Sequence, residues 1–579
     1  MPRLTARLAL AAALLAAVPV LGAQTYPKGG DPRDDLAHGM ANAGVAIQGM
    51  RHLGTAPKSA AFDSTRGLTF VNSDLAFRGN LVYQGNFAGF TIWDVRDAAK
   101  PVLVAEVPCI TSQGDPSIVG NLLFISAEGT GNRNDCAKGG VQKPEDGMMG
   151  VRIYDVSNPK MPRLVKNVQT CKGSHTHTVV PHPTDRNIVY IYVSGNQGVR
   201  QGMAGCVAGD DPADESNSLY RLDVIKVPVH HPEMAEVVTG ARIFTGIGPV
   251  ARRGGRQASG GPRNCHDVTA YPAMGLLAGA CASAGLLVDI SNPEKPVRLD
   301  AVADTNFSLW HTAVFSNDGK KVVFTDEWGG GTQPMCQKTS MMEMGGNTTL
   351  VIGADRKMKQ HAYFKIPTAQ TDRENCVSHN GSLIPVPGRD VMVQGWYQGG
   401  VNLIDFTDAD KPYEIGFFDR GPVDAPRAAD DTTRRRGGTI AGSWGAYWYN
   451  GRIYSSEMAR GLDILELVPT AHLSANEIAA AKLVMMDEFN PQSQPKITWP
   501  AAFPVVRSYV DQLERGKGLP AGRIAAIRAA LDKAEAANGA ARRTALTTLA
   551  GQIDGDVAGS SDAERVKTLA AEVRRLAGK

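Results

Sequence analysis

The chain has 579 residues, too many for one ordinary hydrophobic core unless that core belongs to a repeat architecture. Its 61 basic and 58 acidic side chains give a formal charge of +3, and this balance argues against nucleic acid as the main partner. The 63 glycines and 34 prolines favour short strands joined by many tight turns.

Residues 1–23 have the pattern of an export signal peptide. Arg3 and Arg7 supply a positive start, residues 8–20 are apolar, and residues 21–23 form an acceptable cleavage site. The apolar stretch is short for a membrane span, so an N-terminal anchor helix is the alternative interpretation. No later stretch reaches the ~20 apolar residues of a spanning helix. We therefore expect a secreted or periplasmic protein with no transmembrane segment after signal removal, and an N-terminal extension at residues 24–47.

One strand-and-turn pattern recurs along the first 470 residues. Strong copies read GFTIWDV, GVRIYDV, AGLLVDI and GVNLIDF, and they end near Asp94, Asp155, Asp289 and Asp405. Weaker copies end near Asp223, Ala354 and Glu466, so the copies lie 51 to 68 residues apart. Apolar residues alternate with period two, which indicates strands rather than helices. A period of this size predicts the blades of a β-propeller with loop insertions.

The repeats predict an all-β fold, a seven-bladed β-propeller over residues 48–470 with four strands in each blade. Blade seven has only three strands before a helical tail begins. The segment MRHLGTAPK, which begins at Met50, has the pattern of the missing outer strand. We therefore expect it to pair beside residues 461–467 and to close the ring of blades.

These strand-plus-turn copies resemble the LVIVD-repeat family over about residues 48–470. The resemblance implies an exported propeller, but no activity follows from it, because repeats and not an active-site motif define that family. From about Leu473 the composition changes. Residues 474–477 form a capping box, and apolar residues recur at helical spacing around Ile524 and Val566. Residues 471–579 are therefore predicted to form a small C-terminal α-helical appendage.

Alignment of the innermost strands places polar residues at one position around a mouth of the central channel. Their first residues are, in chain order, Asp74, Asp115, His177, His266, His311, His379 and Trp444. The imidazoles of His177, His266, His311 and His379 are expected to converge and to bind a transition metal ion, namely copper, iron or zinc. Groups expected to orient these ligands or to add to them are Asp74, Asp115, Glu128, His175, Glu327 and Glu457. A water-filled structural channel and a metal-free binding site are the alternatives.

A histidine ring of this kind favours an exported metal-dependent enzyme, an oxidoreductase or a hydrolase, acting on a small molecule. Its chemistry resembles that of two propeller groups. The carotenoid-cleaving oxygenases imply iron on four histidines, and the selenium-binding, methanethiol-oxidase group implies copper. The long loops 129–147, 195–217 and 329–346 are expected to rise on the same face as a lid. The alternative function is a non-catalytic cell-surface or periplasmic scaffold that binds protein partners.

Eight cysteines in an exported chain favour disulfides. Three of them lie in the long loops after second strands, and three lie just before innermost strands. The strand order predicts three bridges, each from a loop to the next blade: Cys136–Cys171, Cys206–Cys265 and Cys336–Cys376. Cys109 and Cys281 are left as free thiols. The alternative is that all eight are reduced core residues.

Overall fold

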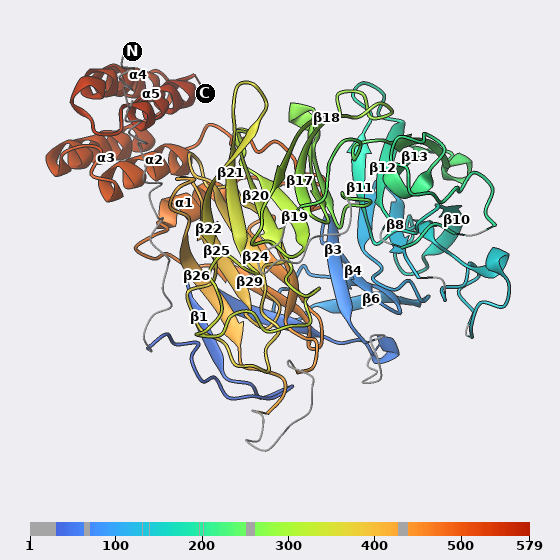
Figure 1. Ribbon diagram of the computed structural model, residues 1–579. Coiled ribbons are helices and arrows are strands. Elements are labelled where there is room, and N and C mark those ends of the chain that lie inside the picture. The colour runs from blue at the N-terminus through green and yellow to red at the C-terminus, as the bar shows by residue number, and fades with distance from the viewer. Residues whose placement is uncertain are drawn as a thin grey trace, which may run out of the picture.

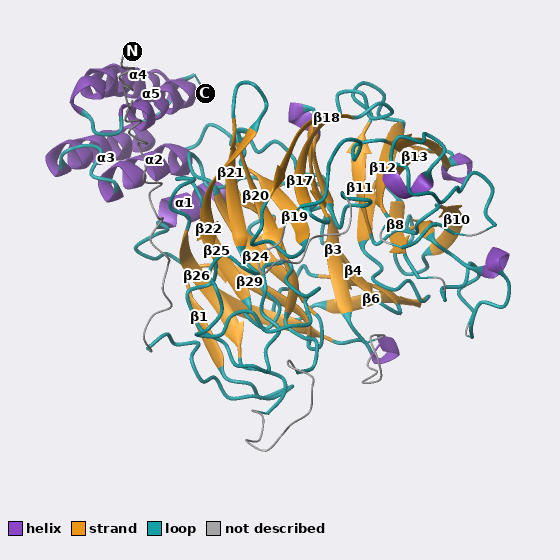
Figure 2. Ribbon diagram, in the orientation of Figure 1, coloured by secondary structure: helices purple, strands orange, loops and turns teal. Residues whose placement is uncertain are grey.

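The computed structural model describes residues 30–578, with gaps at 63–69, 130, 138, 196, 201, 251–260 and 426–437 (Figure 1). Strands make up most of the molecule, and the long helices gather at the C-terminal end of the chain (Figure 2). The predicted signal peptide lies outside the described residues. No helix in the described part of the chain is long and apolar enough to cross a bilayer.

Five consecutive four-stranded antiparallel units follow one another along the chain, and each runs in sequence order across its sheet. They are β3–β6 (Asn72–Arg78, Leu81–Asn86, Gly89–Asp94, Val102–Pro108), β7–β10 (Pro116–Val119, Leu122–Ala127, Gly150–Asp155, Arg163–Gln169), β11–β14 (Thr176–Pro181, Ile188–Ser194, Leu222–Pro228, Glu236–Ala241), β15–β18 (Val268–Tyr271, Leu276–Cys281, Ala284–Asp289, Val297–Ala303) and β19–β22 (Trp310–Phe315, Lys321–Asp326, Asn347–Ile352, Met358–Phe364). The repeated motif forms the third strand in each of these units, as β5 does in the first.

The remaining strands of the propeller form one nine-stranded sheet. In sheet order its strands are β1 (Val45–Gln48), β26 (Tyr413–Arg420), β25 (Val401–Asp405), β24 (Val391–Gly395), β23 (Asn380–Ile384), β27 (Ser443–Tyr449), β28 (Arg452–Glu457), β29 (Gly461–Leu467) and β2 (Met50–Pro57). At its middle, β23 and β27 pair in parallel through only two residue pairs, whereas all other neighbours are antiparallel. β1 adds a fifth strand outside β26.

The first strands of the units form a closed circle. β3, β7, β11, β15, β19, β23 and β27 contact one another in turn, and β27 also contacts β3. Apolar side chains fill the space between neighbouring sheets; Phe90 and Ile92, for example, pack against Ile125 of the next unit. The last such cluster joins Leu462 of β29 to Leu75 of β3, so the circle of buried clusters also closes. This arrangement is a β-propeller, and it explains why strand centres are apolar on both faces.

The N-terminal strand closes the ring as predicted. β2 pairs antiparallel with β29, in a register from Met50 opposite Leu467 to Pro57 opposite Gly461. Ala56 is fully buried in the cluster between the last unit and the first. The last unit therefore contains strands from the two ends of the propeller sequence, which leaves no open edge at that joint.

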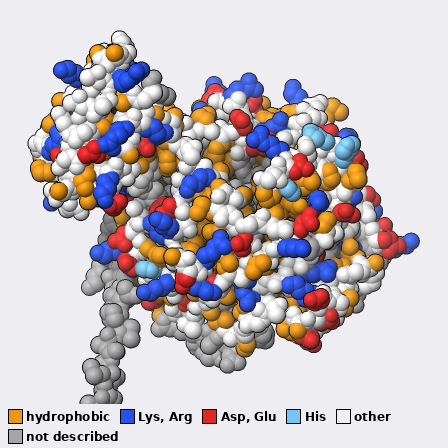
Figure 3. Space-filling model, turned by 90° about the horizontal axis from the view of Figure 1, so that it is seen from above, with side chains coloured by type: hydrophobic (Ala, Val, Ile, Leu, Met, Phe, Trp, Pro, Cys, Tyr) orange, Lys and Arg blue, Asp and Glu red, His pale blue; other side chains and the backbone are white. Residues whose placement is uncertain are grey.

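Five helices follow the propeller: α1 (Ala475–Ala481), α2 (Phe503–Arg515), α3 (Ala521–Ala536), α4 (Gly539–Asp556) and α5 (Ala563–Ala577). The predicted capping box between Ser474 and Glu477 opens α1. α2 to α5 enclose a hydrophobic core of their own, with Ile527 and Leu569 fully buried. Figure 3 shows this bundle standing to one side of the propeller, with basic and acidic side chains interspersed over both.

The segment between α1 and α2 crosses one mouth of the propeller, which the sequence did not indicate. Its short strand β30 (Glu488–Phe489) pairs with β3. Gln492 and Gln494 then exchange backbone hydrogen bonds with Ala270 of β15, and the Gln494 side chain bonds both backbone groups of Phe315 in β19. The segment therefore spans first strands on opposite sides of the channel, and we call residues 488–497 the plug.

The predicted bridge Cys336–Cys376 is present, but the other pairings differ from the prediction. The structure has Cys109–Cys136, Cys171–Cys206 and Cys265–Cys281, and every cysteine is paired. In an antiparallel hairpin the start of the first strand lies beside the end of the second. In these three bridges a connector therefore meets the loop or strand end of the unit that it enters, whereas Cys336–Cys376 joins the loop of one unit to the connector into the next. The predicted pairings Cys136–Cys171 and Cys206–Cys265 were wrong by one unit, and Cys109 and Cys281 are not free thiols.

Candidate metal centre

Three predicted ligands lie side by side at the channel mouth opposite the plug. His311 is the second residue of β19, and His266 and His379 come just before β15 and β23. The ring centroids of His266 and His311 are 4.0 Å apart, as are those of His311 and His379. The ring of Trp444, the equivalent position in the last unit, lies 4.8 Å from His379. Equivalent strand positions in neighbouring units thus bring these imidazoles together.

Glu327, at the end of the strand after His311, lies among the three imidazoles. Its Oε2 atom is 3.7 Å from His266 Nε2 and 3.8 Å from His311 Nε2, and its Oε1 atom is 3.8 Å from His379 Nε2. Donor atoms of His311, Glu327 and His379 all lie within 4.8 Å of one another. Ligands of one first-row metal ion, each ~2.0–2.2 Å from it, are separated by distances of this order.

His177 does not join this group. Its Nδ1 atom lies 2.8 Å from Ser126 Oγ, and its ring packs edge-on against Phe124. His175, two residues earlier, takes its place, with its ring centroid 4.2 Å from that of His266. The alignment of motifs placed the strand correctly, but the structure brings His175 rather than His177 beside His266.

Hydrogen-bond acceptors fix the orientation of the imidazoles. His379 Nδ1 donates to the backbone oxygen of Trp444, so the lone pair of its Nε2 is free. His266 Nδ1 lies 3.2 Å from Asp267 Oδ1, and His175 Nδ1 lies 2.9 Å from Glu128 Oε1. Acceptors of this kind behind a histidine commonly hold the tautomer in which Nε2 binds a metal.

Several buried imidazole nitrogens at the mouth have no hydrogen-bond partner among the described residues. They are both nitrogens of His311 and Nε2 of His379, in side chains that are at most 1% exposed, and Nε2 of the buried His177, which lies outside the group. Burial lowers the pKa of His311 well below its ordinary value and that of His379 to about 3, so both rings are neutral. A neutral, buried imidazole nitrogen costs free energy unless something binds it, and a metal ion fits these donors.

The neighbouring histidines change the pKa values of the carboxylates at the mouth. Burial alone would raise the pKa of Glu128, but the neighbouring His175 outweighs it and the pKa falls to about 2. The pKa of Asp267 is also lowered, because its hydrogen bond to His266 outweighs its burial. Burial raises the pKa of Glu327 and the imidazole of His266 only partly opposes it. Glu128 and Asp267 are therefore ionised acceptors behind their histidines.

Two other predicted carboxylates, Asp74 and Asp115, are buried close to one another. Asp74 accepts hydrogen bonds from Tyr447, Asn380 and Gln492 of the plug, deep in the channel. Asp115 is buried, and burial together with the charges of Asp74 and Asp267 raises its pKa well above the usual range.

Glu457 was expected near the histidines, but it is held by its own hairpin. Its carboxylate accepts from the backbone amides of Gly442 and Ala459 and pairs with Arg460. The turn after β28 folds back over the carboxylate, and this local capping explains the acidic residue at that position.

Tyr397 is a site residue that the sequence reasoning missed. Its hydroxyl donates to Glu327 Oε1, and its ring lies 4.5 Å from that of His379. Its backbone φ is +50°, a left-handed conformation that is uncommon for a tyrosine. The backbone strain is tolerated where it brings the phenol to Glu327, as at many functional sites. In the sequence, Tyr397 is marked only by its place in an aromatic pair, Trp396 and Tyr397, shortly before the repeat motif.

The loop after Glu327 covers this pair. Gly331 has φ +68°, and a Cβ atom there would overlap the Tyr397 hydroxyl and Glu327 Oε1. Gly330 has φ +63° but has open space around it. Both glycines therefore adopt a left-handed backbone conformation, but only Gly331 lies close to the side chains of Tyr397 and Glu327.

We expect Gly331→Ala to lower the free energy of unfolding by about 1–3 kcal/mol more than Gly330→Ala does, because both variants carry the same φ penalty but only one disturbs Tyr397 and Glu327. Denaturant unfolding of the two variants beside the wild type measures this difference. Equal destabilisation would mean that the loop does not rest on the site.

Solvent reaches the mouth from one side. His175 and His266 keep 6% and 8% exposure, whereas His311 is fully buried. Gln197, from the long loop after β12 (Ile188–Ser194), donates to Glu128 at this entrance. The loop after β20 (Lys321–Asp326) covers the opposite end through Gly331. The four imidazoles of His175, His266, His311 and His379 lie side by side in this order, and we call them the histidine row. Solvent therefore reaches the row at its His175 end.

Comparisons with known proteins give little beyond the architecture. No protein family profile matches the chain, and no curated protein is similar to it in sequence.

Among solved structures the chain is similar to Sqt1 of Saccharomyces cerevisiae, with 12% identity, a TM-score of 0.39, and coverage of 73% of this chain and 100% of that one. It is also similar to hydrazine synthase of Kuenenia stuttgartiensis, with 12% identity, a TM-score of 0.43, and coverage of 70% and 98%. The propeller of Dos1 gives 10% identity, a TM-score of 0.37, and coverage of 68% and 77%. Overlaps this weak carry no argument about function, and the assignment of the fold rests on the strand pairing.

Proposed function

We propose that this chain is an exported metalloprotein that holds a transition metal ion at the channel mouth, with His311, Glu327 and His379 as ligands. The observation that carries the proposal is the set of unpartnered, buried, neutral imidazole nitrogens around Glu327. A structural channel would be expected to satisfy such nitrogens with hydrogen bonds, because leaving them dry is costly.

Two further parts of the proposal concern the architecture and the compartment. We divide the nine-stranded sheet between β23 and β27, which share only two residue pairs, and so count seven blades of the LVIVD type. Four disulfides support an oxidising destination, secreted or periplasmic. The signal-like residues 1–23 agree with it.

We further propose that the protein is an oxidoreductase acting on a small molecule. Two histidines and one carboxylate are the ligand set of many non-haem iron enzymes, and imidazole also suits copper. Hydrolysis at such an ion commonly needs a free general base, but Glu128 is engaged by His175 and Gln197. Asp267 is engaged by His266. When bound, iron or copper supplies one-electron chemistry. The chain's own residues orient the ligands through Trp444 and Tyr397 and exclude water at His311.

Metal analysis tests the proposal. The full chain, exported to the periplasm and purified without a metal-affinity tag, is expected to carry about one or more iron or copper ions per chain. His311→Ala removes a buried ligand and is expected to lower the metal content at least tenfold. His361→Ala is the matched control, because His361 lies in the outer strand β22, where it pairs with the exposed Asp410.

The outcomes separate the parts of the proposal. Wild-type protein without metal, even after reconstitution with Fe(II) or Cu(II), would contradict the metal site and favour the scaffold function. Equal metal content in His311→Ala and His361→Ala would place the ion elsewhere. A site that accepts only zinc would leave the metal site standing but overturn the oxidoreductase.

A further inference from the structure

The two histidines at the open end of the row make an unusually direct contact. His175 Nε2 and His266 Nε2 are 2.7 Å apart, in rings nearly perpendicular to one another. Both side chains are about nine-tenths buried. A separation this short between two ring nitrogens needs a bridging positive charge or a hydrogen between them.

The acceptors behind the two rings decide which nitrogens carry hydrogen. Glu128 Oε1 lies 2.9 Å from His175 Nδ1, and Asp267 Oδ1 lies 3.2 Å from His266 Nδ1. Each Nδ1 therefore faces a carboxylate, and a neutral ring that carries its hydrogen on Nδ1 has a lone pair on Nε2. Two lone pairs facing each other at 2.7 Å repel unless a cation lies between or beside them.

This pair lies beside the three-ligand group of the proposed function, with His266 Nε2 3.7 Å from Glu327 Oε2, but it extends the row beyond that group. The described residues contain two groups of three possible ligands within 4.8 Å, one formed by His266, Asp267 and His311 and the other by His311, Glu327 and His379. His266 belongs to the first group and His379 to the second, so the two residues do not occur together in either group. Opposite ligands of a single ion would lie within about 4.4 Å of each other at bonds of ~2.2 Å. The four imidazoles therefore form an open row with two centres rather than one closed ring.

The charge at the mouth also exceeds what one ion would balance. Glu128 and Asp267 stand behind His175 and His266, while Glu327 stands among the remaining histidines. Three carboxylates thus face four imidazoles in a buried site. One divalent ion near Glu327 would leave the charges at the His175 end without a cation.

We propose that His175 and His266 form a second cation site, which binds a divalent transition metal ion through their Nε2 atoms, with Glu128 and Asp267 as the carboxylates behind them. The proposal rests on the metal site around Glu327 and makes the mouth a two-ion centre. Because imidazole nitrogens bind it, the second ion belongs to the same class as the first, and calcium or magnesium does not fit. The second site lies at the solvent-accessible end, where a small substrate would arrive.

Titration with Co(II) tests the second site. Metal-stripped full-length protein with intact disulfides is titrated while visible absorption and bound cobalt are measured. The wild type is expected to bind about two ions per chain, and His175→Ala and His379→Ala about one each. His231→Ala is the matched control, since His231 is exposed beside Glu233, and it should bind as the wild type does. Circular dichroism and thermal unfolding confirm that each variant is folded.

Every stoichiometry decides something. Two ions in the wild type and one in each variant support the proposal. One ion in the wild type that His175→Ala retains means that a proton bridges the pair, and it overturns the second site alone. One ion that is lost in both variants means a single shared site, which also overturns it. No cobalt bound by the wild type would overturn the proposed function as well. As an independent readout, Glu128→Gln should weaken only the second equivalent, by about 10–100-fold.

Discussion

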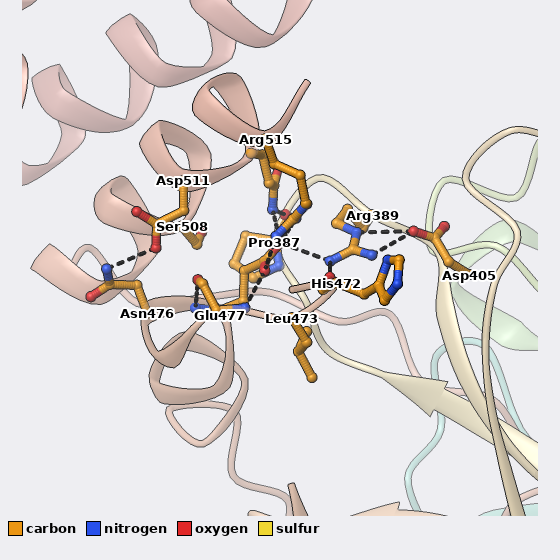
Figure 4. A network of polar contacts seen from close by, with 12 residues as sticks. Pro387, Arg389, Asp405, His472, Leu473, Asn476, Glu477, Ser508, Asp511 and Arg515 are labelled. Atoms are coloured by element: carbon orange, nitrogen blue, oxygen red, sulfur yellow. Dashed lines mark hydrogen bonds and ion pairs between the residues drawn. The ribbon is translucent and has the colours of Figure 1, made fainter. Parts of the chain in front are cut away.

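Replacing Arg389 with alanine is expected to destabilise the junction between the propeller and the helical bundle by about 3–5 kcal/mol, because the change leaves the buried Asp405 without its cation and removes one of the two arginines that pair with Glu477. Arg389 donates to Asp405 in β25 and to Glu477 in α1, as Figure 4 shows. Arg389 and Asp405 are about 5% exposed and Glu477 is fully buried. Arg515 and Gln512 of α2 also bond Glu477, so one carboxylate ties two helices to the propeller.

Hydrogen exchange of α1 and α2, combined with denaturant unfolding, measures this effect. Arg507→Ala is the matched control, since its partners Asp532 and Glu535 are 69% and 46% exposed and such pairs contribute about 0–1 kcal/mol. Similar losses in both variants would show that the buried network is not what holds the bundle.

The same network gives the prediction a pH dependence. Burial would raise the pKa values of Asp405 and Glu477, but their hydrogen bonds and ion pairs lower both below their ordinary values. A lowered carboxyl pKa contributes stability that is present above about pH 4–5 and is lost as the pH falls through the folded-state value. The wild type should therefore lose more stability than Arg389→Ala between pH 7 and pH 3. A larger loss in the variant would contradict this assignment.

Deleting residues 24–57 is expected to prevent stable folding of the propeller, whereas deleting residues 24–48 should be tolerated much better. The longer deletion removes β2, exposes the edge of β29 and empties the position of Ala56 between the last and first units. The shorter one removes β1, an added strand whose Val45 is 54% exposed. Both deletions remove the same preceding segment, so their difference isolates β2.

Soluble yield after export and the thermal midpoint compare the two deletions. The longer deletion should aggregate or unfold at least about 10 °C lower than the shorter one, which corresponds to a loss of several kcal/mol. Closely matched midpoints would show that β2 is dispensable and that the ring closes without it.

The strand order of the propeller was predictable because its signal is local. Period-two apolar segments such as GFTIWDV formed strands at the expected places, and the absence of an outer strand before α1 correctly identified residues 50–57 as its replacement. The capping box at Ser474 was also a local pattern. The boundary between two blades in the nine-stranded sheet has no such signal, since β23 and β27 pair across it.

The histidine row was partly predictable. Repeat alignment brought His266, His311 and His379 together with Glu327, because equivalent positions in a propeller face one axis. It could not distinguish His175 from His177, which lie two residues apart in the sequence.

Other features depend on contacts that no repeat encodes. The disulfides follow which loop lies beside a connector in space, and the first prediction shifted two of them by a unit. Tyr397 reaches Glu327 only through a left-handed backbone conformation. The plug closes the far mouth from outside the repeats, through Gln492 and Gln494.

The most direct test of the central claim is anomalous diffraction from crystals of the full chain, recorded on both sides of the absorption edge of the metal that the purified protein contains. The account predicts an anomalous peak within about 2.0–2.3 Å of donor atoms of His311, His379 and Glu327. Absence of any peak at the mouth in protein shown to contain the metal, or a peak only at another place on the molecule, would contradict it.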